Sequence, residues 1–395
     1  MRKLYVLCLV TAMAFMAAGV QAGPLADATA DTLWGIEIGG FIDVSYQYNF
    51  NDPDGRLGGN NLRFNDVDHN DLNLHGLQLY MDRLPEEVED VGFRFDVMIG
   101  EDADNIGDNI TGDPDDFNLY QAYISYIAPI GNGLTIDVGR FVTWHGYEVI
   151  ESPANDNFSR SWLFTYAVPY THTGLRLTYP INDQWEISGG ITQGWDVVDD
   201  NNEAKTGHLA VRWMPMETLY IQNSIAYGSE LDEDTIDPSE GEQTFLYDLV
   251  ASWNVREDIT LGANFDYINQ EIPNQSDADL WGLAGYIRYD VNEQLYLAFR
   301  GEYVDAEIIG GVAVVVDPVT GNIILDPAGN PVLTGGVGED VDLWEVTFTL
   351  GYQVTDGLET RLEFRHDDAD EDIFADNNGF DDTQDTIALE IIYAF

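Results

Sequence analysis

Apolar and polar residues alternate along most of the chain with a period of two. Segments 91–100, 172–180 and 358–366 show this pattern clearly, and such alternation predicts β-strands with one apolar face. Counting alternating segments of about nine or more residues predicts sixteen strands. They lie near residues 35–50, 70–83, 90–100, 117–129, 132–142, 170–180, 184–194, 206–214, 217–228, 243–255, 258–269, 279–291, 293–305, 341–354, 357–367 and 385–395.

The connectors between the predicted strands are alternately long and short. Those after even-numbered strands are turns rich in Gly, Pro, Asn and Asp, such as 129–133 and 181–183, whereas those after odd-numbered strands are long and acidic, such as 101–117. Strands of roughly ten residues with short turns at one end and long loops at the other predict an all-β fold, a transmembrane antiparallel barrel of the bacterial outer membrane. A soluble β-sandwich or propeller is the alternative, but neither requires such unequal loops, and the chain has no repeat of fixed period.

The N-terminal residues have the pattern of an export signal. Residues 1–22 contain Arg2 and Lys3, an apolar stretch at 4–20 and small residues at 20–22, which predicts a cleaved secretory signal peptide. The apolar run is short for a membrane anchor helix, the alternative. We therefore expect a periplasmic segment at 23–34 and one barrel domain at 35–395. The only cysteine, Cys8, lies in the signal, so the mature chain contains no disulfide.

The mature chain is strongly acidic. Without Arg2 and Lys3, it has 14 Lys and Arg against 71 Asp and Glu, a net charge of −57. This charge excludes nucleic acid as a partner through repulsion. It reflects solubility, a saline habitat, or attraction of cations towards a pore mouth.

Charged residues inside the strands lie opposite the apolar face. Arg94, for example, stands between Phe93 and Phe95. An arginine facing lipid at mid-bilayer would cost about 2–4 kcal/mol, so these side chains are expected to line a pore lumen and to bias ion passage; paired charges that only stiffen the scaffold are the alternative. Arg140 shares the parity of lipid-facing residues, and a bulge at Gly139 or a position at the rim would resolve the conflict. The predicted lumen residues are Arg94, Asp96, Arg176, Arg212, Arg288, Arg300, Glu302, Glu359, Arg361, Glu363 and Arg365.

The connector at 142–169 is unusually aromatic and less acidic than the other long connectors. A long loop with apolar residues packs against another surface. We expect it either to enter the lumen as a constriction or to contact a neighbouring subunit. Its candidate constriction residues are His145, Glu148, Glu151, Asp156 and Arg160.

The region 139–174 also resembles a known family. The elements Gly139-Arg140-Phe141, Gly146-Tyr147-Glu148, Ser152-Pro153-Ala154-Asn155, Phe158-Ser159-Arg160-Ser161 and Thr171-His172-Thr173-Gly174 are similar to those of the OmpL-like outer-membrane β-barrel porins. The resemblance implies a barrel fold and a porin-like passive channel. It implies no particular substrate and no binding residues.

Other chemistry has little support in the sequence. His145, Asp156 and Ser159 suggest a hydrolase only loosely, because no nucleophile motif accompanies them, and we predict no enzyme. Asp102, Asp104, Gly107 and Asp108 miss the spacing of a calcium loop. The six histidines show no paired spacing, so we expect no transition-metal site and no cofactor.

These observations predict a channel for small hydrophilic solutes or ions, weakly cation-selective, in the outer membrane. The alternative is a plugged barrel that acts as an adhesin or receptor through its acidic loops. The expected partners are outer-membrane lipid and lipopolysaccharide, with low-affinity Ca²⁺ or Mg²⁺ at their shared acidic surface, and the permeating solutes or cations. A homotrimer is expected by analogy with other sixteen-stranded porins.

Overall fold

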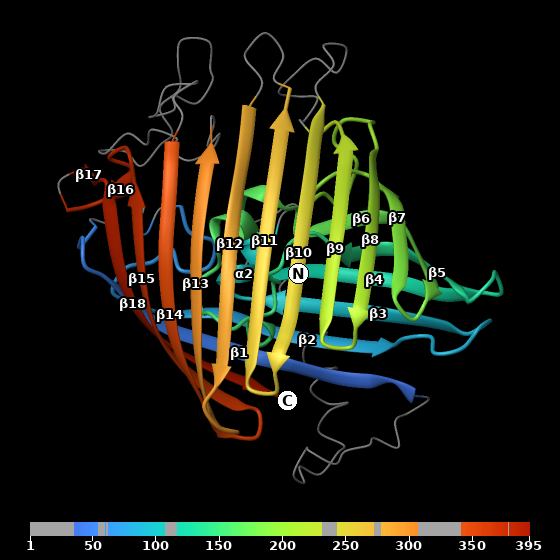
Figure 1. Ribbon diagram of the computed structural model, residues 1–395, viewed down its shortest axis with the longest axis horizontal. Coiled ribbons are helices and arrows are strands. Elements are labelled where there is room, and N and C mark those ends of the chain that lie inside the picture. The colour runs from blue at the N-terminus through green and yellow to red at the C-terminus, as the bar shows by residue number, and fades with distance from the viewer. Residues whose placement is uncertain are drawn as a thin grey trace, which may run out of the picture.

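The chain forms a closed antiparallel β-barrel of sixteen strands in a computed structural model (Figure 1). The structure describes residues 35–53, 60, 62–106, 117–230, 243–271, 278–306, 341–377 and 379–395; the predicted signal peptide and periplasmic segment lie outside this range. The barrel strands are β1 (Glu37–Asn49), β2 (Asp71–Arg83), β3 (Val91–Ile99), β4 (Phe117–Ala128), β5 (Leu134–Val142), β6 (Thr171–Asn182), β7 (Trp185–Thr192), β8 (Thr206–Met216), β9 (Leu219–Gly228), β10 (Thr244–Arg256), β11 (Ile259–Gln270), β12 (Ala278–Asp290), β13 (Leu295–Ala306), β14 (Val341–Thr355), β15 (Leu358–Ala369) and β18 (Thr383–Ala394).

The barrel closes between its first and last strands. β18 pairs with β1 and β15, with Phe41 opposite Ala394 and Tyr48 opposite Ile387. Every other strand pairs with its neighbours along the chain. Closure leaves no unpaired sheet edge, which is the condition for β-structure in a bilayer. The sixteen predicted strands are confirmed, with ends that differ by a few residues.

Some short elements do not belong to the ring of strands. The helix α2 (Glu101–Asn105) follows β3, and a two-stranded hairpin of β16 (Phe374–Ala375) and β17 (Phe380–Asp381) lies between β15 and β18 (Figure 1). No helix in the described part of the chain is long and apolar enough to cross a membrane.

Alternation along the strands separates an apolar outer face from a polar inner face. On β1, Ile38, Ile42 and Tyr46 are exposed, whereas Asp43 and Ser45 are buried inside the barrel. The outer face also carries aromatic side chains near strand ends, where Trp185 and Trp213 stack at 5.6 Å. Such an outer surface is suited to lipid and to the membrane interface.

Arg140, the exception to the sequence pattern, is buried rather than directed at lipid. Gly139 has a φ of +138°, and this conformation lets both Arg140 and Phe141 turn inward. A Cβ at Gly139 would lie 2.2 Å from the Ala122 carbonyl oxygen. The local irregularity therefore depends on glycine, and the Arg140 guanidinium reaches the Thr171 hydroxyl at 3.2 Å.

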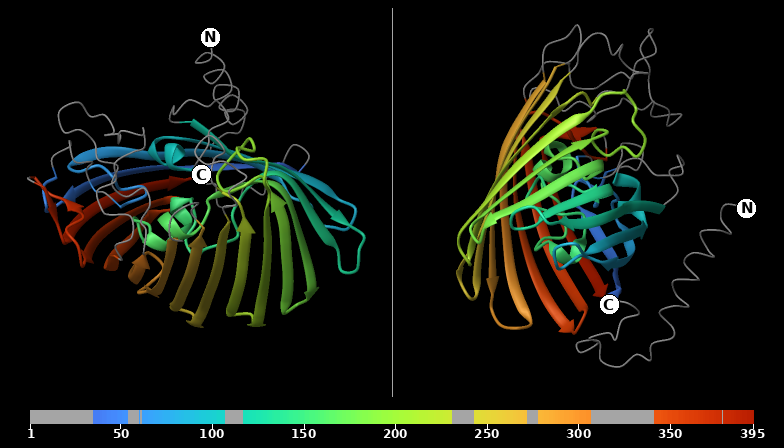
Figure 2. Two further views of the ribbon diagram at one scale, coloured as in Figure 1. Left: turned by 90° about the horizontal axis from the view of Figure 1, so that it is seen from above. Right: turned by 90° about the vertical axis from the view of Figure 1, so that its right-hand side faces the viewer.

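The connection between β5 and β6, residues 143–170, folds back inside the ring of strands (Figure 2). We call this segment the inner loop. It contains a short 3₁₀ turn, η3 (Ser152–Ala154), and one π-helical turn, η4 (Leu163–Ala167). The barrel is thus filled from within over part of its height, and the core of the molecule lies between the inner loop and the wall.

Candidate functional site

Wall carboxylates hold the backbone of the inner loop. Glu363 on β15 accepts hydrogen bonds from the amides of Phe158 and Ser159, at 2.7 and 2.9 Å. Glu302 on β13 accepts from Trp162 and Leu163, at 2.7 and 2.8 Å. A carboxylate that bridges two consecutive amides makes charge-assisted bonds, which are stronger than neutral ones.

Wall arginines bind the carbonyl groups of the same segment. Arg300 donates to the Ser159 carbonyl and forms ion pairs with Glu148 of the loop and Glu345 of β14, at 2.8 and 2.7 Å. Arg365 donates to the carbonyl oxygen of Arg160 at 2.6 Å. The charges on β13–β15 that the sequence placed in the lumen therefore serve, in large part, to dock the inner loop.

Arg361 and Glu359 extend this set towards the 3₁₀ turn. Arg361 donates to the Ser152 carbonyl at 3.1 Å and pairs with Glu359 and Glu390, at 2.6 and 3.3 Å. Glu359 also accepts from the Tyr296 hydroxyl at 2.8 Å. An arginine surrounded by acceptors in this way has its charge neutralised, which is required when it is buried.

Apolar packing fixes the other side of the inner loop. Trp162 and Leu163 are fully buried against a cluster that includes Leu280 and Val304 of the wall. Phe164 packs edge-on against Phe64, with ring centroids 5.0 Å apart. Burial of such large side chains contributes roughly 1.5–3 kcal/mol each, so the docked position does not depend on charges alone.

Two wall glycines make room for the loop. A Cβ at Gly262 of β11 would lie 2.4 Å from the Tyr147 ring, and one at Gly282 of β12 would lie 2.7 Å from Leu163. Small residues on the inner face of these strands thus permit close approach of loop side chains.

Of the loop acids singled out from the sequence, two are paired with wall arginines. Glu148 pairs with Arg300, as described above, and Asp156 pairs with Arg288 of β12 at 2.7 Å. Glu151 accepts from the Tyr120 hydroxyl at 3.1 Å, and removal from water raises the pKa of its carboxyl. The loop therefore presents less net negative charge to the lumen than its composition suggests.

The remaining two loop candidates have other contacts. Arg160 faces its own loop, donating to the carbonyl oxygens of Val149, Phe158 and Ile150. His145 lies 2.7 Å from the Ser224 hydroxyl of β9, and burial lowers the pKa of its imidazole well below the usual value. Arg160 thus acts within the loop rather than as a cation directed at the lumen.

Another group of predicted lumen arginines is partly exposed. Arg94 pairs with Asp96 and Asp82, each at 2.8 Å. Arg176 pairs with Asp137 at 2.9 Å. These side chains keep contact with water on the inner wall, and each stands beside a carboxylate of opposite charge.

Arg212 and Arg288 belong to the same partly exposed group. Arg212 lies 3.5 Å from Glu186 and hydrogen-bonds to Gln222. Arg288 stacks on the Tyr296 ring at 3.8 Å from its centroid. Arg94, Arg176, Arg212 and Arg288, each with an adjacent carboxylate, thus keep part of their surface open to solvent on the inner wall.

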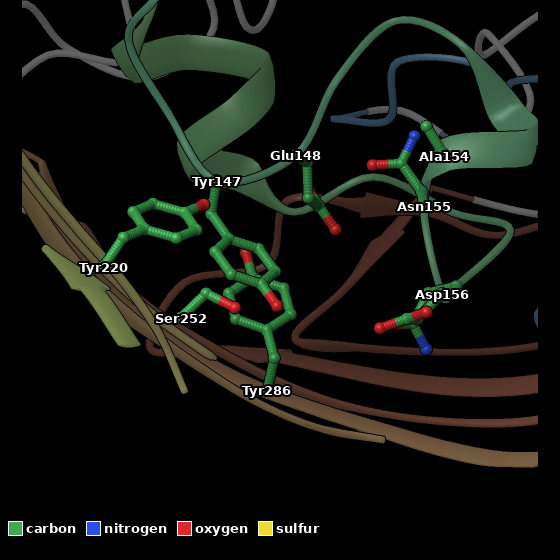
Figure 3. A pocket seen from close by; sticks show the side chains of 9 residues that line it. Tyr147, Glu148, Ala154, Asn155, Asp156, Tyr220, Ser252 and Tyr286 are labelled. Carbon is green, nitrogen blue, oxygen red and sulfur yellow. The ribbon is translucent and has the colours of Figure 1, made fainter. Parts of the chain in front are cut away.

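An open pocket of about 180 Å³ lies between the inner loop and the wall (Figure 3). Tyr147 of the loop stacks on Tyr286 of β12 at 4.2 Å, and both face it. Polar side chains complete its lining, namely Glu148, Asn155, Asp156, Asn157, Tyr220 and Ser252. Aromatic and polar groups together suit contact with a hydrophilic solute.

The loosely suggested hydrolase residues do not form a catalytic set. Asp156 is paired with Arg288, the Ser159 hydroxyl oxygen accepts a hydrogen bond from Arg300, and His145 contacts Ser224. In the chain from His145 through Ser224 to Asp248, the serine stands between the histidine and the acid. A nucleophilic triad requires the histidine in the middle, so this order does not activate the serine.

Asp102, from the segment that loosely resembles a calcium loop, has a histidine as its neighbour. Asp102, in α2, is buried and lies 3.6 Å from His75. Gly107 and Asp108 lie outside the described residues.

Another acid near the barrel mouth, Asp196 in the β7–β8 connection, accepts hydrogen bonds from the amides of Tyr170 and Thr171 at 2.8 and 2.7 Å.

One cluster had no signal in the sequence. His145, His172 of β6 and His208 of β8 come together with ring nitrogens within 4.8 Å of one another. They are distant in the chain and stand on three different elements, so spacing alone could not reveal them. Only the curvature of the barrel and the inward course of the loop bring them together.

A closed sixteen-stranded barrel with an inward-folded loop and a charged inner wall is the architecture of outer-membrane channels. The comparisons agree with this class. A family model described as "Putative beta-barrel porin-2, OmpL-like" matches residues 35–395. The chain belongs to this OmpL-like porin family, which confirms the resemblance seen in the sequence and places the protein in the outer membrane.

Solved structures of low sequence identity share the fold. OmpT of Vibrio cholerae in its trimer form matches with a TM-score of 0.59 at 10% identity, covering 91% of this chain and 99% of that one. The outer-membrane channel DcaP of Acinetobacter baumannii gives 0.56 at 12% identity, covering 92% and 99%. An anion-selective porin from Comamonas acidovorans gives 0.57 at 12% identity, covering 91% and 99%. A search of curated protein sequences finds no match.

Proposed function

We propose that the protein is a passive diffusion channel for small hydrophilic solutes or ions, with weak cation selectivity, whose narrowest part is formed by the inner loop. The observation that carries this proposal is the inner loop itself. It lies inside a closed barrel, and four wall charges, Glu302, Glu363, Arg300 and Arg365, bind its backbone.

The inner wall supports a polar pathway. Partly exposed Arg94, Arg176, Arg212 and Arg288 stand beside carboxylates. Opposite charges at close range create a transverse field that orients polar solutes and disfavours apolar ones. The pocket beside Tyr147 widens this path next to the loop.

The cation preference rests mainly on the overall charge, with a smaller contribution from the charges at the constriction. Glu148 and Asp156 of the loop are paired with arginines, so the local charges nearly balance. The excess of 71 acidic over 16 basic residues in the whole chain attracts cations towards the mouths. Screening over about 8–10 Å at physiological salt makes this preference weak and dependent on salt.

The alternative function is a plugged barrel that binds ligands or cells through its outer loops. Dense packing favours it, because inner-face side chains such as Asp43, Asp248 and Glu390 are completely buried. Such a protein would not conduct. We place the passive channel first because Arg94, Arg176, Arg212 and Arg288 keep contact with water inside the barrel.

Export and assembly complete the proposal. The chain is delivered through a signal peptide cleaved after Ala22, it contacts outer-membrane lipid and lipopolysaccharide, and low-affinity divalent cations bridge its acidic outer surface to lipopolysaccharide. The trimer form of OmpT supports a trimer for this chain. The protein acts without catalysis and without a cofactor.

Reversal potentials test the selectivity. In a KCl gradient across a planar bilayer, the wild-type channel should show a small cation preference that shrinks as total salt rises. Asp156→Asn leaves Arg288 without its loop partner, so the preference should move towards anions. Asp258→Asn is the matched control, because Asp258 pairs with Arg256 at a turn away from the inner loop. An anion-selective wild-type channel would overturn the proposed selectivity, and equal shifts in both variants would overturn the role of Asp156.

A further inference from the structure

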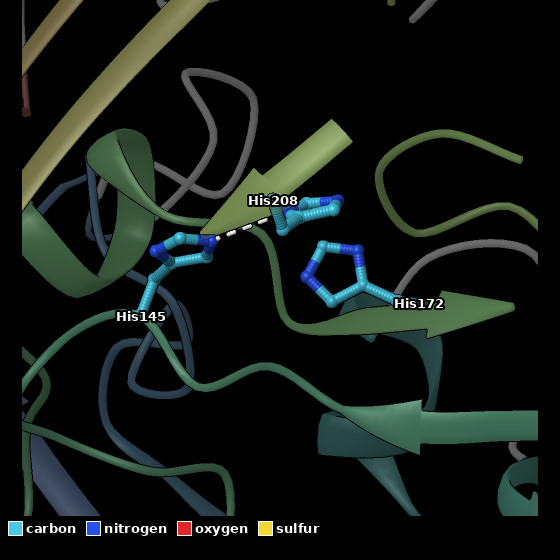
Figure 4. A group of neighbouring side chains, drawn as sticks. All are labelled: His145, His172 and His208. Carbon is cyan, nitrogen blue, oxygen red and sulfur yellow. Dashed lines mark hydrogen bonds between the residues drawn. The ribbon is translucent and has the colours of Figure 1, made fainter. Parts of the chain in front are cut away.

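His145, His172 and His208 approach one another on the inner side of the barrel (Figure 4). His145 stands at the start of the inner loop, His172 at the start of β6 and His208 in β8. All three side chains are buried. The ring nitrogens His145 Nε2 and His208 Nδ1 are 3.2 Å apart.

Neighbouring oxygens define which nitrogens carry hydrogen. The Ser224 hydroxyl donates to Asp248 at 2.7 Å, so it accepts from His145 Nδ1–H. The Gly194 carbonyl can only accept, so His172 Nδ1 donates to it. These tautomers leave lone pairs on His145 Nε2 and His172 Nε2. The Thr143 hydroxyl donates to His172 Nε2 at 3.1 Å, and a metal ion at this nitrogen would replace that hydrogen bond.

His208 completes the group. Its Nε2 lies 3.0 Å from the Thr192 hydroxyl, which itself donates to Gly194. Thr192 therefore accepts from His208 Nε2–H, and His208 Nδ1 presents a third lone pair. Two lone pairs 3.2 Å apart repel each other unless a proton or a cation lies between them.

We propose that His145, His172 and His208 form a binding site for one divalent transition-metal ion of the zinc, nickel, copper or cobalt class. Imidazole nitrogens bind Zn²⁺ at about 2.0–2.1 Å, so tetrahedral ligands stand roughly 3.3 Å apart. The His145–His208 pair already has this spacing, and the ligand nitrogens of all three histidines lie within 4.8 Å of one another, so rotation of the His172 side chain would complete the set. Three neutral nitrogen donors favour these metals over Mg²⁺ and Ca²⁺, which prefer oxygen.

The surroundings resemble those of known metal-binding histidines. Each imidazole has an oxygen at its outer nitrogen, and the Ser224 hydroxyl relays His145 to the Asp248 carboxylate. Such outer partners orient a ligand and increase its basicity. The Trp144 ring covers the cluster, with centroids 5.0–5.6 Å from the three imidazoles.

A bound ion would join the base of the inner loop to β6 and β8. This site is independent of conduction, so it can be tested whether or not the barrel is an open channel. Its expected role is to hold the loop at residue 145, where the wall charges of β13–β15 do not reach.

Co²⁺ titration of the refolded full chain in detergent provides the direct test. Excess Mg²⁺ is included to saturate the many carboxylates. The expected result is one equivalent of Co²⁺ with visible ligand-field bands of nitrogen coordination, displaced by Zn²⁺, and Cu²⁺ should show nitrogen hyperfine splitting in its EPR spectrum. Absence of nitrogen-coordinated metal in the wild-type protein would overturn the proposal and assign the cluster to hydrogen bonding among the histidines.

Variants then identify the ligands. His172→Gln and His208→Asn should each weaken Co²⁺ binding by at least about tenfold. His69→Gln and His366→Gln are matched controls outside the cluster and should bind like the wild type. Heat-modifiable migration on gels shows which variants form the barrel. If one of the two ligand variants fails to fold, the other still tests the assignment. Wild-type affinity in a folded ligand variant would contradict the assignment.

Discussion

Removal of Glu302 and Glu363 tests most directly whether wall carboxylates hold the inner loop in place. In the double variant Glu302→Ala, Glu363→Ala, four loop amides lose their acceptors, those of Phe158, Ser159, Trp162 and Leu163. All four of these residues are buried in the wild-type protein. The inner loop should therefore leave its docked position for part of the time.

The size of the effect follows from the cost of an unsatisfied buried group. Each amide without a partner costs about 1–3 kcal/mol, so four cost about 4 kcal/mol even at the lower limit. Since every 1.4 kcal/mol is a factor of ten, the ratio of docked to undocked loop falls roughly a thousandfold. Apolar packing of Trp162 and Leu163 opposes release and sets how far the loop moves.

Single-channel recording measures the outcome. The double variant should show larger and noisier conductance than the wild type, and its inner loop should become susceptible to protease. Glu186→Ala is the matched control, because Glu186 is an inner-face glutamate that pairs with Arg212 and does not contact the loop. Conductance, noise and protease resistance equal to those of the wild type would refute the idea that these carboxylates hold the constriction.

Two further predictions concern stability. Removal from water raises the pKa of Asp196 to about 7, above the unfolded value of about 3.9. The folded protein therefore binds an extra proton between these pH values and loses stability as pH rises from about 4 to 7. Asp196→Asn should raise the unfolding temperature more at pH 8 than at pH 5, and equal changes at both pH values would contradict this. Gly139→Ala introduces a Cβ 2.2 Å from the Ala122 carbonyl oxygen at a φ of +138°, and it should destabilise the barrel by about 1–3 kcal/mol in urea unfolding. The control Gly285→Ala, whose Cβ meets nothing within 4 Å, should not. Similar urea midpoints for the two variants would show that the Gly139 conformation is not required.

The barrel could be predicted from the sequence because its determinants are local. Lipid outside and water or polar groups inside impose a period of two on every strand, and the strand ends are marked by turn residues. Even the exception was informative, because Arg140 violated the parity next to a glycine whose positive φ resolves the conflict. The sixteen strands followed from these patterns without knowledge of any contact distant in sequence.

The partners of the inner-face charges could not be predicted in the same way. Parity placed Arg300 and Glu302 inside the barrel, but it could not show that they bind loop residues more than a hundred positions earlier. The acidic loop residues therefore looked unpaired in the sequence. Their pairing depends on where a long connector folds, which is a property of the closed barrel.

The histidine cluster illustrates the same limit more strongly. His145, His172 and His208 have no regular spacing, and two of them stand on strands separated by β7. Sequence motifs for metal sites rely on ligands close together in the chain. A site assembled across a barrel wall gives no such motif.

The most direct test of a loop-constricted passive channel is the single-channel conductance of the refolded wild-type protein in a planar bilayer. The account predicts discrete current steps in KCl that increase with salt concentration, because ions pass through water beside the inner loop. A protein that is verified as a folded barrel and inserted in the bilayer, yet produces no current steps, would contradict the account and identify the structure as a plugged barrel.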